Sequence, residues 1–134
     1  MFNEADQLTM SVYKATQSFP RDEWFGLRAQ ARRAAVSIAS NLVEGNARRT
    51  TRSYMNFLDI SRGSAAELEY LIELATDLGY LAPATSTGLL RQCSVLIPRL
   101  EALLAKMEVL ALQEEDRRRT GTVNPRRSGV RGAA

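Results

Sequence analysis

Two rows of apolar side chains at helical spacing run through the stretch from Arg28 to Arg49 and the residues just before it. These rows constrain the fold more than any other feature. The first row steps by four and three residues, as one face of an α-helix does, and contains Leu27, Ala31, Ala34, Ile38, Asn41 and Gly45. The second row lies about 140° round the helix and contains Phe25, Ala29, Arg32, Val36, Ala39 and Val43. A surface helix needs only one apolar face to cover a core. We therefore expect the second face to contact another subunit, with Phe25, Val36 and Val43 at the oligomer interface.

Periodicity predicts three further helices and no strand. The four expected helices run from about Asn3 to Ser18, Asp22 to Glu44, Thr50 or Thr51 to Leu78, and the Thr85–Thr87 region to Gln113. Asn3 and a threonine at 50 or 51 are expected N-caps, and Gly79 is the expected stop of the third helix. Pro98 lies inside the fourth pattern, which predicts a bend, with two shorter helices as the alternative. Short connections between four helices favour an all-α, antiparallel, up-down-up-down four-helix bundle.

The second and third helices are expected to pair as an antiparallel hairpin that turns near residue 48. This pairing sets Ala34 and Ala35 opposite Ser61 and Arg62, so that small residues allow a close approach. It also puts Glu44 beside Arg52 as a bracing ion pair near the turn.

Charge is distributed unevenly along the chain. Residues 28–62 carry seven arginines against two acids, residues 63–116 carry three basic residues against nine acids, and residues 117–134 carry six arginines and no acid. The last segment has almost no apolar residue to bury, so we expect a four-helix bundle over 1–116 and a disordered arginine-rich tail over 117–134.

The residue types present exclude most catalytic chemistry. The chain has no histidine, which removes a required member of zinc peptidase motifs and Ser-His-Asp triads. Cys93 falls in the apolar repeat of the fourth helix and is expected to be a core side chain. Glu69, Glu73 and Asp77 share a helix face and could bind a hard metal ion, but a solvated acidic face is the simpler interpretation. We expect no enzyme activity, no metal and no cofactor.

Two further features concern location and packing. A single cysteine and an acidic start without a leader pattern indicate a cytoplasmic protein, and no stretch is long and apolar enough to cross a membrane. Asn41 lies in the core row of the second helix, where its amide needs partners such as Ser37 or the serines of the third helix.

Arginine is the functional signal, because sixteen of the eighteen basic residues are arginine, which binds phosphate with a planar fork. The candidate nucleic-acid-binding residues are Arg28, Arg32, Arg33, Arg48, Arg49, Arg52, Arg117, Arg118, Arg119, Arg126 and Arg127. Salt bridges with acids of the third helix on a neighbouring subunit are the competing use for these side chains.

Several motifs together resemble a known family. The order Phe19-Pro20, G-L-x-x-Q at 26–30, R-R-A-A-x-S-I at 32–38 and N-x-x-E-G at 41–45, followed by Arg48, is similar to four-helix-bundle proteins encoded by intervening sequences in bacterial large-subunit ribosomal RNA genes. The similarity continues through Tyr54, Phe57-Leu58, G-S-x-x-E-L-E at 63–69 and L-G-Y-L at 78–81, and covers about residues 5 to 110. The same family includes the accessory variability determinant of diversity-generating retroelements.

The resemblance implies an antiparallel four-helix bundle that assembles as a ring-like homopentamer. In the retroelement branch it implies a positively charged barrel that binds nucleic acid and a reverse transcriptase. The sequence departs from the family pattern at Leu42-Val43, where Ile-Ala is common, and the arginine-rich tail lies outside the shared region, so no family-wide binding site carries over to the tail.

Two functional hypotheses follow. The first is a non-enzymatic, oligomeric bundle that binds the backbone of RNA or DNA with low sequence specificity, as an accessory to a ribosomal RNA intervening sequence or a retroelement reverse transcriptase. The alternative is a structural oligomeric adaptor that binds a protein partner and no nucleic acid.

Overall fold

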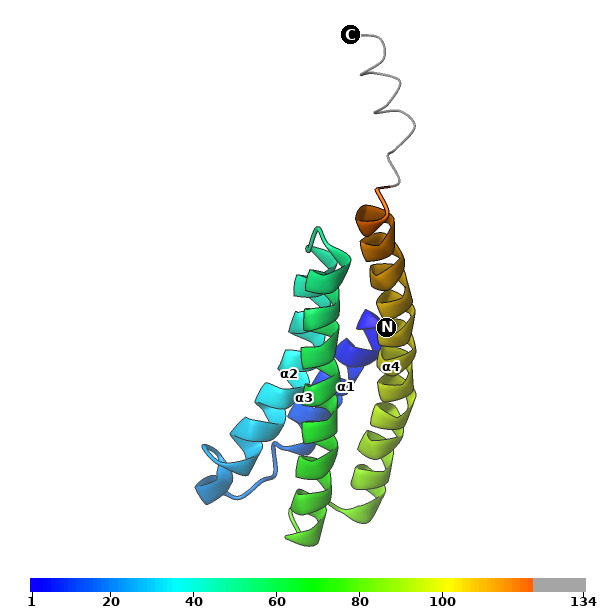
Figure 1. The fold of residues 1–134 in the computed structure, drawn as a ribbon. Coiled ribbons are helices and arrows are strands. Elements are labelled where there is room, and N and C mark those ends of the chain that lie inside the picture. Colours follow the sequence, from blue (N-terminus) through cyan, green and yellow to red (C-terminus); the bar gives the residue numbers. More distant parts are fainter. Residues whose placement is uncertain (122–134) are drawn as a thin grey trace.

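A computed structural model describes residues 1–121 and shows four α-helices (Figure 1). The helices are α1 (Phe2–Ala15), α2 (Leu27–Asn46), α3 (Thr51–Asp77) and α4 (Pro83–Arg119), with a short 3-10 helix, Arg21–Glu23, between α1 and α2. The predicted all-α class and antiparallel bundle are confirmed.

The helix ends show where local signals decide a boundary. Thr50 caps α3 as predicted, because its side chain accepts a hydrogen bond from the Ser53 amide at 3.1 Å. Gly79 stops α3 with a positive φ of 81°, a conformation that costs an L side chain energy. In contrast, α1 starts at Phe2, before the predicted cap Asn3, and α2 starts at Leu27 rather than near Asp22.

The fourth helix is longer than predicted. It begins at Pro83, a residue whose fixed φ suits a first helical turn, and runs unbroken through Pro98 to Arg119. Three arginines in its last turn interact favourably with the negative end of the helix dipole. Arg117, Arg118 and Arg119, which the sequence assigned to a disordered tail, are therefore helical, and residues 122–134 of that expected tail lie outside the described residues.

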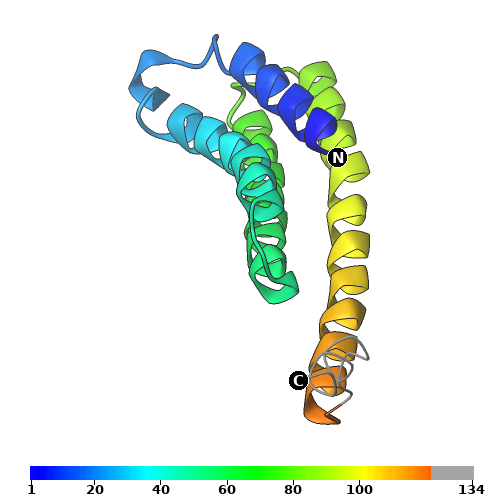
Figure 2. The same cartoon turned by 90° about the horizontal axis from the view of Figure 1, so that it is seen from above.

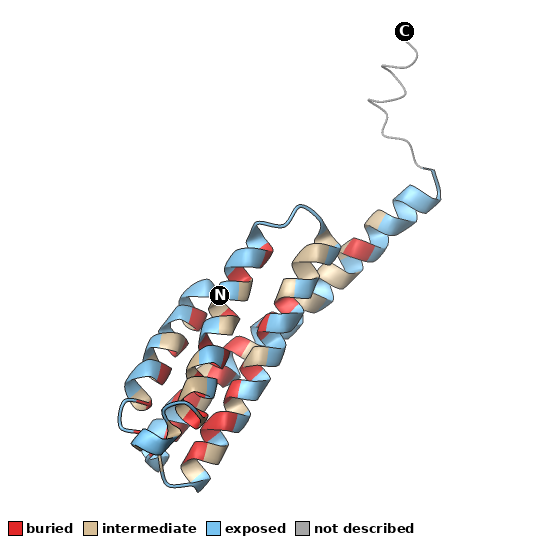
Figure 3. Cartoon of the chain, turned by 90° about the vertical axis from the view of Figure 1, so that its left-hand side faces the viewer, coloured by how far each residue is buried: buried red, intermediate tan, exposed pale blue. Residues whose placement is uncertain are grey.

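The core lies between the apolar faces that the periodicity identified. Its fully buried side chains come from all four helices and include Leu8, Val12, Ile38, Leu58, Leu68, Leu96 and Leu100. α2 pairs with α3 and α1, and α4 pairs with α3 and α1, so α2 and α4 lie diagonally across the bundle. The alternation of buried and exposed residues along each helix is visible in Figure 3.

The α2–α3 hairpin has a different register from the predicted one. The Ser61 hydroxyl donates to the Ile38 carbonyl at 2.8 Å, and the hydroxyls of Ser37 and Ser64 lie 2.7 Å apart. These pairs are displaced by about one helical turn from the register that set Ala34 and Ala35 opposite Ser61 and Arg62. A rule based on the midpoint of the turn ignores which sides of the two helices face each other, and this omission caused the error.

The helices differ in length, which leaves one end of α4 extended. α1 is about 20 Å long and α4 about 55 Å, at 1.5 Å per residue. Figures 1 and 2 show the N-terminus beside the middle of α4, where Arg99 pairs with Glu4. Beyond that point α4 continues alongside α3 to the α2–α3 turn, and it carries its arginine-rich end there.

Candidate nucleic-acid interface

The candidate arginines near α2 lie in two groups at opposite ends of that helix. The first arginine group is Arg28, Arg32 and Arg33 near the start of α2, and the turn arginine group is Arg48, Arg49 and Arg52 around the α2–α3 turn. Twenty residues separate Arg28 from Arg48, which corresponds to about 30 Å of helix. The two groups therefore form separate surfaces of one subunit.

Aromatic rings and neutral oxygens hold Arg28 and Arg32 of the first arginine group. The Arg28 Cζ lies 4.6 Å from the centre of the Trp24 ring, and the Arg21 Cζ lies 5.3 Å from the same centre. The Arg32 Cζ lies 4.4 Å from the centre of the Tyr13 ring. Cation–π contacts of this kind attract the guanidinium without neutralising its charge.

Hydrogen bonds fix Arg32 more firmly than its neighbours. Its Nε donates to the Thr16 hydroxyl at 2.9 Å, and its Nη2 donates to the Tyr13 carbonyl at 3.1 Å. Arg33 is exposed and has no ion pair within residues 1–121. Within residues 1–121 no carboxylate forms an ion pair with Arg28, Arg32 or Arg33, so the start of α2 presents positive charge that no ion pair neutralises.

The segment between α1 and α2 creates this arrangement. Phe19 is buried, with its ring centre 5.6 Å from that of Tyr80, and its carbonyl accepts a hydrogen bond from the Trp24 indole at 3.2 Å. This anchor positions Trp24 ahead of α2, where Arg28, the second residue of the helix, covers the ring. Composition and spacing identified the arginines, but the contacts with Trp24 and Tyr13 were not predicted.

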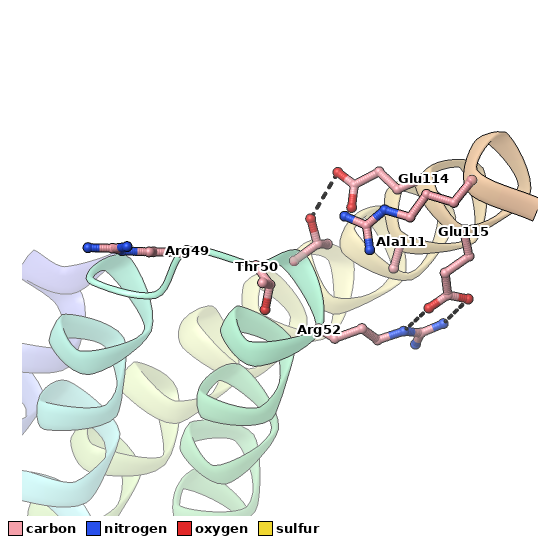
Figure 4. Close-up of a pocket in the computed structure, with 8 residues that line it drawn as sticks. Arg49, Thr50, Arg52, Ala111, Glu114 and Glu115 are labelled. Carbon is pink, nitrogen blue, oxygen red and sulfur yellow. Dashed lines mark hydrogen bonds and ion pairs between the residues drawn. The ribbon is translucent and has the colours of Figure 1, made fainter. Parts of the chain in front are cut away.

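Carboxylates hold most of the turn arginine group. Arg52 donates from Nε and Nη2 to Glu115 at 2.8 and 3.2 Å (Figure 4). It also donates from Nη1 to Glu108 at 2.9 Å. Its hydrogen bond to Glu115 raises the pKa of Arg52 above its usual range and lowers the pKa of the Glu115 carboxyl. Arg52 thus ties α3 to α4 and has little capacity left for a phosphate.

The predicted pair between Glu44 and Arg52 is wrong. Glu44 instead pairs with Arg48 at 3.6 Å, one turn along the chain, and the Arg48 Cζ also lies 5.3 Å from the centre of the Phe57 ring. Arg52 takes both partners from α4: Glu108 lies within the predicted helix, and Glu115 lies in the six residues by which α4 extends beyond its predicted end. Arg49 is exposed and has no ion pair in the described part of the chain.

A pocket of about 190 Å³ lies between the turn and the end of α4 (Figure 4). Its lining mixes both charges and comprises Arg49, Thr50, Thr51, Arg52, Ala111, Glu114, Glu115 and Arg118. Thr51 donates to Glu114 at 3.1 Å, and Arg119 pairs with Asp116 at 2.9 Å. This end of the molecule is therefore partly neutralised, while Arg126 and Arg127 lie outside the described residues.

The predicted oligomer face is open in a single subunit. Phe25 is 95% exposed, Val43 is 55% exposed and Val36 is 42% exposed. They form no part of the subunit's core, so their role at an interface stays a prediction.

The other candidate residues have structural surroundings. Cys93 is fully buried, and burial raises the pKa of its thiol to about 12, with a further contribution from Glu69. Asn41 donates to the Ser37 carbonyl at 2.8 Å and to the Ser37 hydroxyl at 3.1 Å, which confirms Ser37 as a partner. Within residues 1–121 no group of three potential metal ligands comes together, and no helix there is long and apolar enough to cross a membrane.

The comparisons with known proteins cover most of the bundle. The model of the family described as 23S rRNA-intervening sequence protein matches residues 1–102. The chain belongs to this family. The family residues named above take clear structural roles, since Phe19, Leu27, Ile38 and Gly45 are all buried.

A solved structure has the same fold. It is the crystal structure of a protein of unknown function from the S23 ribosomal protein family of Bacteroides thetaiotaomicron, with a TM-score of 0.72 and 17% sequence identity. The alignment covers 78% of this chain and 94% of that one. No curated protein matches the chain.

Proposed function

We propose that this protein is a non-enzymatic, oligomeric helical bundle that binds the phosphate backbone of RNA or DNA with low sequence specificity. The observation that carries the proposal is that aromatic rings and neutral oxygens, rather than carboxylates, hold Arg28 and Arg32 of the first arginine group. Backbone binding depends on uncompensated cations that displace counterions from phosphates, and these side chains supply them.

The stacked geometry also favours binding. Arg28 on Trp24 and Arg32 on Tyr13 are already ordered, so less side-chain entropy is lost when a phosphate arrives. The family description refers to sequences within 23S rRNA, which favours RNA as the nucleic acid. The protein would then act as an accessory to a ribosomal RNA intervening sequence. The family resemblance leaves a retroelement reverse transcriptase as the other partner, and a reverse transcriptase gene beside this one would favour that branch.

Other arginines would add to the surface. Arg49 is free of ion pairs within the described residues, and the end of α4 carries Arg117, Arg118 and Arg119, with Arg126 and Arg127 further along the chain. A homo-oligomer, a pentamer by family resemblance, would repeat each group around the assembly and strengthen binding through multivalency. Phe25, Val36 and Val43 would supply one subunit contact.

One observation favours the alternative of a structural adaptor that binds a protein. Arg48 and Arg52 are paired with carboxylates, as arginines used only for packing would be. If the first arginine group also serves only to hold α1 against α2, no nucleic-acid surface remains.

A titration with matched variants tests the proposal. Arg28→Gln/Arg33→Gln and Arg48→Gln/Arg49→Gln each remove two positive charges, from the first and the turn arginine group respectively. We would titrate the two double variants, and the unmodified full-length protein as the reference, against a short structured RNA and a DNA duplex at roughly 50 and 200 mM salt. Loss of two phosphate contacts should reduce the slope of log affinity against log salt by about 2.

We expect Arg28→Gln/Arg33→Gln to lose more affinity, and more of the slope of log affinity against log salt, than Arg48→Gln/Arg49→Gln. An equal or larger loss for Arg48→Gln/Arg49→Gln would assign the interface to the turn instead. Absence of binding by the full-length protein at the lower salt concentration would reject the proposal and favour the adaptor.

A further inference from the structure

Phe25 is the most exposed large apolar side chain within residues 1–121, with 95% of its surface accessible to solvent. The next most exposed, Tyr70, reaches 60%. Trp24, the neighbour of Phe25 in the chain, is held against the subunit because its indole donates a hydrogen bond to the Phe19 carbonyl at 3.2 Å. Of two consecutive aromatic residues ahead of α2, one is therefore anchored and the other projects into solvent.

The structure separates Phe25 from the apolar row of α2. Sequence periodicity placed Phe25 in one row with Val36 and Val43, because the expected helix included residue 25. α2 instead begins at Leu27, and its N-cap Gly26 has φ −104° and ψ −112°, which are not helical angles. The helical spacing that relates Val36 to Val43 therefore does not extend to Phe25, which lies in the turn ahead of the helix.

Unpaired positive charge lies beside Phe25. The Cζ atoms of Arg21 and Arg28 lie 5.3 and 4.6 Å from the centre of the Trp24 ring, and Trp24 adjoins Phe25 in the chain. Neither arginine forms an ion pair within residues 1–121. An apolar protein contact centred on Phe25 would have to desolvate these cations, which is costly without partners. A nucleic acid supplies phosphates for them.

The acids of the same segment do not neutralise this charge. Partial burial raises the pKa of the Tyr80 phenol, and the carboxylates of Glu23 and Asp22 raise it further. Both carboxylates thus lie close to Tyr80, whose ring packs on that of Phe19. They act on the phenol, and the arginines beside Trp24 keep their charge.

An exposed aromatic ring beside unpaired cations is the combination that binds single-stranded nucleic acids. Unpaired bases stack on aromatic side chains, and this stacking tolerates any sequence because every base has a flat face. The phosphates next to a stacked base can then bind the planar fork of a guanidinium group. In a duplex the bases are stacked on one another and paired, so their faces are not available to a protein ring.

We infer that Phe25 stacks an unpaired base and that the ligand of this surface is a single-stranded stretch of RNA or DNA, with its phosphates on Arg21 and Arg28. This inference rests on the proposed nucleic-acid function and narrows it from backbone binding in general to unpaired segments. It assigns Phe25 to the ligand in place of the expected subunit contact, and it leaves Val36 and Val43 to that contact.

Three probes separate stacking from charge. The first is an unpaired RNA of about ten nucleotides, within the site size of single-strand binders. The second is the same strand with abasic sites in place of its bases, which keeps every phosphate and lacks the flat faces. The third is the duplex formed by the first strand and its complement. Each is titrated with the full-length protein at roughly 50 and 200 mM salt.

Three variants complete the experiment. Phe25→Leu removes the exposed ring without a change of charge, and circular dichroism checks that its helices are intact. Phe25→Tyr keeps a ring at the same position. Phe2→Leu removes a ring that is 44% exposed at the start of α1 and is the matched control.

We expect Phe25→Leu to bind the unpaired RNA at least about fivefold more weakly than the wild type. Its affinity for the abasic strand and for the duplex should stay within about twofold of the wild type. The slope of log affinity against log salt should not change, because no charge is removed. Phe25→Tyr should bind the unpaired RNA as the wild type does, and Phe2→Leu should leave all three affinities unchanged.

The outcomes distinguish this inference from the function on which it rests. No loss on the unpaired RNA, or an equal loss on all three probes, would overturn the stacking role, while salt-dependent binding by the wild type would keep the proposed function. A lower mass of Phe25→Leu in light scattering would assign the ring to a subunit contact and would also overturn the inference. Absence of binding of every probe by the wild type at the lower salt concentration would reject both.

Discussion

Gly45 near the end of α2 is the position where a single methyl group should do most to separate two helices. A Cβ built on Gly45 would lie 3.0 Å from Cδ1 of Tyr54 and 3.2 Å from Cβ of Phe57. Tyr54 is half-buried, and its ring can rotate away. The Phe57 Cβ is bonded directly to the α3 backbone, so relief at that contact requires α2 and α3 to move apart.

The magnitude follows from two opposing effects. Replacement of glycine by alanine inside a helix stabilises the folded state by about 0.5–1 kcal/mol, because the unfolded chain loses backbone freedom. Overpacking of a tight contact costs about 1–3 kcal/mol. We expect Gly45→Ala to lower the free energy of unfolding by about 1 kcal/mol, since the overpacking cost exceeds the helical gain.

Gly63 on α3 is the matched control. A Cβ on Gly63 meets nothing within 4 Å, so Gly63→Ala keeps the helical gain and should stabilise by about 0.5–1 kcal/mol. Urea unfolding, followed by circular dichroism at one protein concentration to hold any subunit association fixed, measures both variants. If Gly45→Ala proves as stable as Gly63→Ala, close approach to α3 is not what requires glycine at position 45.

Three further predictions address other contacts. Ser61→Ala removes the buried hydrogen bond to the Ile38 carbonyl and should cost about 1 kcal/mol in urea unfolding; an unchanged midpoint would mean that the bond contributes nothing net. The pKa of Glu115 is lowered by Arg52, so the pair stabilises the fold above the unfolded pKa, near 4.5, and this contribution is lost as pH falls through the folded pKa. Glu115→Gln should therefore flatten the loss of stability on acidification, and a pH profile identical to that of the wild type would contradict this. Cys93, buried and with a thiol pKa of about 12, should react with a thiol reagent at neutral pH only as fast as the chain opens, and immediate labelling of the native protein would refute its burial.

Features set by local spacing were predictable from the sequence. The core rows of α2 and α4, the Thr50 cap and the Gly79 stop all depend on residues within one or two helical turns. α4 also carries an exposed apolar row, which includes Val95, Val109 and Leu112, with the same spacing as its core row. Spacing alone does not tell which of two apolar rows a single subunit buries.

The candidate site was only partly predictable. The sequence identified the arginines, and burial confirmed Cys93 as a core side chain. The bonds that distinguish one arginine from another span long stretches of chain, from Arg32 to Tyr13 and Thr16, and from Arg52 to Glu108 and Glu115. The predicted register of the α2–α3 hairpin was wrong by about one turn. That error, together with the underestimated length of α4, suggested Arg52 as the partner of Glu44, which instead pairs with Arg48.

The sequence by itself determined the four helices, their core faces and the abundance of arginine, because helical periodicity and capping act between residues that are close in the chain. Only the tertiary structure decided which arginines keep an uncompensated charge. Aromatic rings of α1 and of the segment before α2 hold Arg28 and Arg32, whereas carboxylates of α4 hold Arg52. Whether a cation is neutralised depends on which elements the fold brings within a few ångströms of it, and those elements are distant in sequence.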